Sequence, residues 1–152
     1  MREAEREEFL AAFSLEALAE REGSMVAFCV LGGIFGEGID LKHEQLIGVL
    51  IVGTGLPQIS NEKEILMQYY EERVGEGFNY AYRYPGMNKV LQAAGRVIRT
   101  AADVGVIALL DDRFLNGDYR DLFPREWSER TVCTVETVEG YLKDFWKEKD
   151  DA

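Results

Sequence analysis

The run GVLIVG at residues 48–53 is the stretch that decides the expected fold. Four consecutive branched aliphatic residues stand between two glycines, which is typical of a short strand buried on both faces of a sheet. The same kind of run occurs as MVAFCVL at 25–31 and as VIALLDD at 106–112. We therefore expect three buried strands.

Helical patterns separate and follow these strands. NEKEILMQYYEER, at 61–73, has apolar residues at helical spacing behind an asparagine cap and two glutamates that suit a helix N-terminus. A second helix is expected over about 86–100 after Pro85, and a third over TVETVEGYLKDFWKEK with Thr134 as its cap. The order strand, loop, strand, helix, helix, strand predicts an α/β fold, a mostly parallel sheet flanked by helices on both faces.

Length and composition limit the class of protein. The 152 residues are 47% apolar, enough for one domain with a real core, and without a repeat or linker we expect residues 1–152 to form it. No apolar run approaches the roughly 18 residues of a membrane span, and the N-terminus is charged, so we expect a cytoplasmic protein without a membrane partner. Cys29 and Cys133 lack metal-binding spacing and are expected to be reduced thiols, and no metal site is expected.

The charge is negative overall but unevenly distributed. A net charge of −11 argues against binding nucleic acid through bulk electrostatics, which needs a basic surface. Residues 82–120 differ from the rest, because they carry six basic and four acidic residues. Anion binding is therefore expected in this part of the chain.

The sequence KVLQAAGRVIRT at 89–100 contains the candidate anion site. Gln92, Arg96 and Arg99 are spaced i, i+4 and i+7, which would place them on one stripe of a helix. Gly95 would leave room for a close approach of another backbone. Two guanidinium groups beside each other favour a phosphate ligand. From spacing alone, pairing of both arginines with surface carboxylates remains the alternative.

QAAGRVIRT resembles motif VI of superfamily 2 helicases, and GGIFGEGIDL is similar to their motif V as it occurs in the XPD and DinG family. The resemblance covers about residues 24–127 and continues through GVLIVGTGLP, NYAYRYPGMNKVLQAAGRVIR, GVIALLDDRF and YRDLFPREW. In that family this segment is the second RecA-like motor domain of an ATP-dependent DNA helicase that moves 5′ to 3′ along single strands. The resemblance implies the same RecA-like fold and the same role here.

The resemblance also implies which residues meet the nucleotide. Gln92, Arg96 and Arg99 would reach the γ-phosphate of ATP, which the first motor domain holds with Mg²⁺. Arg99 would be the arginine finger that stabilises charge developing on the transferred phosphoryl group. The motif V loop would add nucleotide contacts from three residues, Glu37, Gly38 and Asp40.

A track for single-stranded DNA is implied beside the nucleotide residues. Gly36 in the motif V loop, together with Lys89 and Arg83 among neighbouring tyrosines, would contribute to it through backbone, charge and stacking surface. An aromatic loop that covers the core is the alternative interpretation of the tyrosines. Arg113, after the last strand, is a further candidate for the cleft between motor domains.

Several family features are absent from the sequence. It has no GxxxxGK[ST] phosphate loop and no Asp-Glu-Ala-His box. We therefore expect the C-terminal part of a longer chain, with the first RecA-like motor domain as its partner and no ATP hydrolysis by these 152 residues alone. The four cysteines that hold an iron–sulfur cluster in many family members would lie in that first domain. The alternative is a free-standing RecA-like module that binds a nucleotide or a protein without catalysis.

Overall fold

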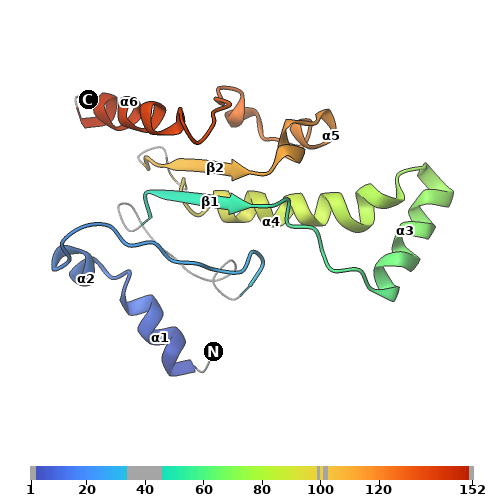
Figure 1. Ribbon diagram of the computed structural model, residues 1–152. Helices are drawn as coiled ribbons and strands as arrows, with labels where there is room; N and C mark the ends of the chain where they lie inside the picture. Colours follow the sequence, from blue (N-terminus) through green and yellow to red (C-terminus); the bar gives the residue numbers. More distant parts are fainter. Residues whose placement is uncertain (1–2, 34–45, 99, 101–102, 151–152) are drawn as a thin grey trace. The chain divides into compact units, whose positions relative to one another are not determined.

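Two of the expected strands form a parallel pair. A computed structural model describes residues 3–33, 46–98, 100 and 103–150; in it β1 (Gly48–Val52) pairs with β2 (Val106–Leu110). The register runs from Gly48 opposite Val106 to Val52 opposite Leu110, so the carboxyl ends of both strands lie at one edge (Figure 1). Parallel strands need a long crossover, and helices supply it here. The parallel pairing and the flanking helices confirm the α/β fold class.

The strand expected at 25–31 does not form. Residues 24–30 are neither strand nor helix, and Val26, Phe28 and Val30 are 75%, 94% and 79% exposed. A continuous apolar run indicates only a preference for burial, whereas a strand exists through hydrogen bonds to a neighbouring strand. The sequence run therefore could not specify a partner for this segment.

The crossover begins with α3 (Asn61–Val74), which confirms the helix expected at 61–73. Its cap is Ser60 rather than Asn61, because the Ser60 hydroxyl accepts a hydrogen bond from the Lys63 backbone N–H at 3.3 Å. The helix ends at Gly75, whose φ of 71° is the left-handed conformation that favours glycine. A π-helical turn, η2 (Asn79–Arg83), then leads directly into α4 (Tyr84–Ala94).

Helix α4 is shorter than the helix expected over 86–100, because it ends at Ala94. The chain turns there so that Val97, only 4% exposed, can pack against the start of β2. A Cβ at Gly105 would lie 2.3 Å from Val97 Cγ1, so only glycine permits this contact. This long-range contact, which the helical spacing does not reveal, sets the end of the helix.

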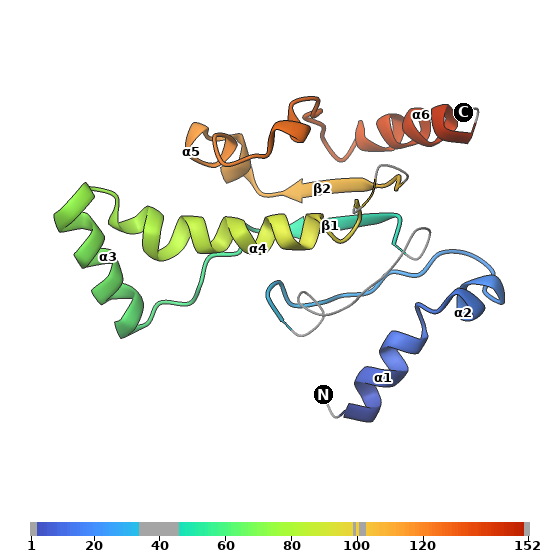
Figure 2. The same ribbon diagram turned by 180° about the vertical axis from the view of Figure 1, so that it is seen from behind.

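Helix α4 covers one face of β1 and runs antiparallel to it (Figures 1 and 2). Its first turn lies at the carboxyl edge of the strands, where a Cβ at Gly86 would be 2.7 Å from the Thr54 carbonyl oxygen. Its far end leads to Val97 at the amino edge, beside Gly105. The buried apolar residues of the two elements are Ile51 on β1 and Met87, Val90 and Ala94 on α4.

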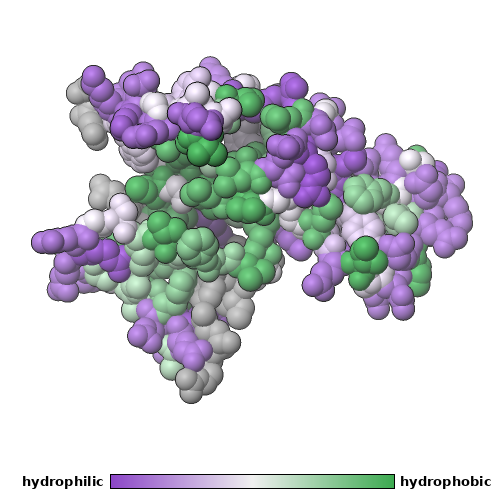
Figure 3. Space-filling view, viewed as in Figure 1, coloured by the Kyte–Doolittle hydropathy of each residue, from purple (hydrophilic) through white to green (hydrophobic). Residues whose placement is uncertain are grey.

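The opposite face of β1 is open among the described residues of Met1–Leu122. Leu50 and Val52 are 68% and 77% exposed there. In Figure 3 the surface over β1 and the 24–31 segment is mainly hydrophobic. A contiguous apolar surface of this kind is typical of an interaction site.

The chain divides into two compact units, Met1–Leu122 and Phe123–Ala152. The first also contains α1 (Glu3–Ala11), α2 (Leu15–Ala19), the 3₁₀ turn η3 (Asp112–Leu115) and α5 (Gly117–Arg120). The second contains the 3₁₀ turn η4 (Arg125–Trp127) and α6 (Val138–Asp150). Thr134 lies in the turn before α6, where its carbonyl accepts from the Val138 N–H at 2.9 Å. None of the helices found in the described ranges has the length and apolarity needed to cross a membrane.

Candidate functional site

The residues expected to bind phosphate lie at and beyond the C-terminal end of α4. Gln92 is in the last turn of the helix, and its exposed side chain has no hydrogen-bond partner within the described part of the chain. Arg96 comes after the helix, in a tight turn where its N–H donates to the Ala93 carbonyl at 3.2 Å. The expected single helical stripe is therefore wrong, because the helix ends before Arg96. Arg99 lies outside the described residues.

The end of α4 still brings two kinds of donor close together in the chain. The Gln92 amide and the Arg96 guanidinium can both donate hydrogen bonds to an oxyanion. A cation near a helix C-terminus also interacts favourably with the helix dipole. The dipole disfavours an anion at this end, so phosphate binding here depends on the donors of these two side chains.

The expected motif V residues, Gly36, Glu37, Gly38 and Asp40, lie outside the described residues. The structure does describe the approach to that loop. Gly32 has a φ of 75°, and a Cβ there would lie 3.0 Å from Lys89 Cδ. The aliphatic part of the Lys89 side chain therefore lies against Gly32, near the last described residue before the expected motif V loop.

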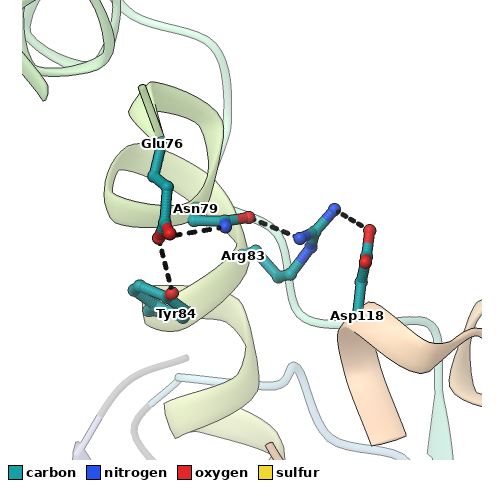
Figure 4. A network of polar contacts seen from close by, with 5 residues as sticks. All are labelled: Glu76, Asn79, Arg83, Tyr84 and Asp118. Atoms are coloured by element: carbon teal, nitrogen blue, oxygen red, sulfur yellow. Dashed lines mark hydrogen bonds and ion pairs between the residues drawn. The ribbon is translucent and has the colours of Figure 1, made fainter. Parts of the chain in front are cut away.

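Arg83, also expected in the DNA track, is held by other parts of the protein (Figure 4). Its Nη1 donates to Asn79 Oδ1 at 2.5 Å, and its Nη2 lies 2.8 Å from Asp118 Oδ2. Its guanidinium carbon is 5.5 Å from the centre of the Phe78 ring and 5.3 Å from that of Tyr119. The side chain is 17% exposed, so its charge faces protein groups more than solvent.

An ion pair between Asp111 and Arg113 lies at the carboxyl edge of the two strands. Asp111 directly follows β2 and accepts three hydrogen bonds from Arg113. Its Oδ1 accepts one from the backbone N–H at 2.9 Å and one from Nε at 2.8 Å. Its Oδ2 accepts one from Nη2 at 2.7 Å. The Arg113 side-chain hydrogen bond is the main cause that lowers the pKa of Asp111 to about 2, and the same bond raises the pKa of Arg113. Arg113 therefore lies at the edge opposite Val97 and the turn that contains Arg96.

Two features of this region were missed by sequence reasoning. Thr54 follows β1 at the carboxyl edge and is 1% exposed, and its hydroxyl has no hydrogen-bond partner among the residues that the structure describes. Its position after a parallel strand was the available signal, because ligands of open α/β sheets bind at that edge. The Tyr82 hydroxyl donates to Glu64 of α3, which raises the Tyr82 pKa to about 12. No sequence spacing pointed to this pair.

Within residues 3–33, 46–98, 100 and 103–150, no three His, Cys, Asp or Glu side chains come together in a way that could hold a metal ion.

Comparison with known proteins gives the family context. The family model for the helicase C-terminal domain matches residues 1–130. The chain is 29% identical over 145 residues to the regulator of telomere elongation helicase 1 homolog of Caenorhabditis elegans, covering 88% of this chain and 14% of that protein. It is 30% identical over 146 residues to regulator of telomere elongation helicase 1 of Bos taurus, covering 90% of this chain and 12% of that protein.

A differently named helicase gives a comparable match. The chain is 28% identical over 149 residues to the ATP-dependent DNA helicase CHL1 of Candida glabrata, covering 89% of this chain and 18% of that protein. The chain thus spans 12% to 18% of the length of these three relatives.

Proposed function

Because the chain belongs to the helicase C-terminal domain family, we propose that it is the second RecA-like motor domain of an ATP-dependent DNA helicase of the XPD and DinG type. One observation carries the proposal: the exposed Gln92 amide and Arg96 stand at the end of α4, in a chain that the helicase family matches over residues 1–130. The relatives are named as helicases, and those named CHL1 as ATP-dependent DNA helicases, which supports ATP and DNA as ligands.

The chain's own residues act on ATP as a substrate held mainly by the first motor domain. Gln92 and Arg96 donate hydrogen bonds to phosphate oxygens, and Arg99 supplies the arginine finger. Glu37, Gly38 and Asp40 belong to the loop that links the nucleotide to DNA. An arginine finger increases turnover by roughly 10³ to 10⁵ in nucleotide hydrolases.

The partner of this domain is proposed to be the first motor domain of the same protein. The exposed apolar residues of the 24–31 segment and of β1 are of the kind that a partner domain covers. Single-stranded DNA is the second partner, and Gly36 and Lys89 contribute to its track. The position of Lys89 beside Gly32 supports this pairing of helix and loop.

DNA-stimulated ATP hydrolysis by the intact protein tests the proposal. Arg99→Ala should lower turnover by about 10³ or more while ATP binding is retained, because the finger acts on charge that develops in the transition state. Arg120→Ala, on an exposed residue of α5, is the matched control and should leave turnover unchanged. The 152-residue chain alone should not hydrolyse ATP.

Two results would contradict the proposal. Unchanged turnover in Arg99→Ala would mean that this arginine is not a finger. A wild-type protein that binds nucleotide or a protein but shows no turnover with DNA would instead favour a module without catalysis.

A further inference from the structure

Arg83 stands where a π-helical turn meets the helix that carries Gln92. In η2 the Tyr84 N–H bonds to the Asn79 carbonyl, which gives the turn one residue more than an α-helical turn contains. The Asn79 side chain also bridges Glu76 Oε2 at 3.4 Å and Arg83 at 2.5 Å. Such turns are rare in proteins, and side-chain contacts hold this one in place.

The other contacts of Arg83 lie on the segment that follows β2. Asp118 and Tyr119 belong to α5, and Tyr119 is 4% exposed. The Tyr119 ring packs edge-on against Phe114, with the ring centres 6.1 Å apart. Phe114 directly follows Arg113 of the Asp111–Arg113 pair. Arg83 thus joins the start of α4 to the segment beyond β2, two regions that the sequence separates by about thirty residues.

These contacts do not suit a DNA phosphate. Two of the nitrogens of Arg83 face protein oxygens, and its exposed fraction is small. The Asp118 carboxylate lies directly beside it, and the Glu76 carboxylate is joined to the same network through Asn79 (Figure 4). Their negative charge would repel a phosphate approaching this arginine.

We infer that Arg83 is a positioning residue of the motor domain, which holds the first turn of α4 against the segment after β2 and makes no contact with DNA. The inference rests on the proposed function, because α4 matters there as the carrier of Gln92 and as the approach to Arg96. Since α4 is one continuous helix of 11 residues, a change in its first turn moves its far end as well. Turnover therefore depends on Arg83 although it touches no substrate.

The test compares four variants of the intact protein: Arg83→Ala, Arg83→Lys, Asp118→Asn and Arg73→Ala. Arg73 is the matched control, because it also lies over a tyrosine ring, at 4.5 Å from the centre of Tyr69, but on α3 and not α4. Hydrogen–deuterium exchange of peptides from 84–98 measures the local stability of α4 and does not depend on enzymatic activity. Steady-state ATP hydrolysis gives kcat and KM for ATP, and binding of a fluorescent single-stranded oligonucleotide gives the affinity for DNA.

We expect exchange in α4 to be roughly tenfold faster in Arg83→Ala and less affected in Asp118→Asn, which loses only the ion pair. Arg83→Lys should recover part of the protection, since it keeps a positive charge beside Asp118. The kcat for ATP should fall about tenfold in Arg83→Ala while KM for ATP and DNA affinity stay within about twofold, a split that general destabilisation does not produce. Arg73→Ala should match the wild type in every measurement.

Unchanged exchange in Arg83→Ala would overturn the inference. Loss of DNA affinity in Arg83→Ala, with normal exchange and a normal Asp118→Asn variant, would identify Arg83 as a DNA contact instead. If the wild type does not hydrolyse ATP, the proposed function fails, and the exchange data still decide whether Arg83 holds α4. If Arg83→Ala does not fold, Arg83→Lys and Asp118→Asn carry the same comparison.

Discussion

Replacing Gly86 with alanine should weaken the contact between α4 and the loop after β1. The added Cβ would lie 2.7 Å from the Thr54 carbonyl oxygen and 3.1 Å from both Gly55 C and Leu56 N. All three are backbone atoms, which cannot rotate away as a side chain would. Ordinary contact begins near 3.4 Å, so the helix and the loop would have to separate by the difference, about 0.7 Å.

Two opposing effects determine the expected change in the free energy of unfolding of Gly86→Ala. Overpacking at a close contact costs about 1–3 kcal/mol. Alanine in place of glycine in a helix stabilises the folded state by up to about 1 kcal/mol. We therefore expect Gly86→Ala to lower the free energy of unfolding by about 1–2 kcal/mol.

Gly117→Ala is the matched control, because this glycine also lies in the first turn of a helix of the same unit. Apart from its chain neighbours and its own helix backbone, no atom of the described residues lies within 4 Å of its Cβ position, so its replacement should leave stability unchanged or raise it by up to about 1 kcal/mol. Urea unfolding of the 152-residue chain, followed by far-ultraviolet circular dichroism, measures both variants. Equal or higher stability of Gly86→Ala relative to Gly117→Ala would refute the reasoning from close backbone contact.

Two further predictions concern pH. The Tyr82 pKa is raised to about 12 by its hydrogen bond to Glu64, so the bond stabilises the fold below about pH 10 and this contribution is lost as the pH rises through 12. Ultraviolet titration of tyrosinate should lose its highest-pH step in Tyr82→Phe, and an unchanged titration would contradict the assignment. The Asp111 pKa is lowered to about 2, so its ion pair with Arg113 contributes stability above about pH 4 that is lost as the pH falls through 2. Because the Arg113 side chain is 46% exposed, Asp111→Asn should lower the free energy of unfolding by less than about 1 kcal/mol at neutral pH. Urea unfolding near pH 2 should show a smaller loss, and an equal loss at both pH values would contradict the ion-pair explanation.

The local patterns predicted α3, β1 and β2, but not which segments pair. Helix α3 is specified by its cap and its spacing, and β1 and β2 by short apolar runs between turn residues. The run at 25–31 looks the same in sequence but is not a strand, because pairing depends on a neighbour that the run does not encode. The presence of a single domain over residues 1–152, and the cytoplasmic location, stay predictions.

The candidate site was predicted as a set of residues rather than as a geometry. Gln92 and Arg96 are close in the chain, but the helix ends between them because Val97 must reach Gly105. That contact joins parts of the chain that helical periodicity treats as independent. The contacts of Arg83 could not be predicted for a related reason: its partner Asp118 lies about thirty-five residues away, where no local pattern connects them.

The π-helical turn also changes the angular phase of the helix it interrupts. An α-helix turns each residue by about 100°, so one additional residue in η2 rotates everything before Asn79 by about that angle relative to α4. A helical wheel drawn continuously through 77–94 therefore assigns Phe78 to the wrong side relative to Val90. Any designed or related sequence that shortens this turn by one residue would rotate the segment before it relative to α4, even if every side chain in α4 were kept.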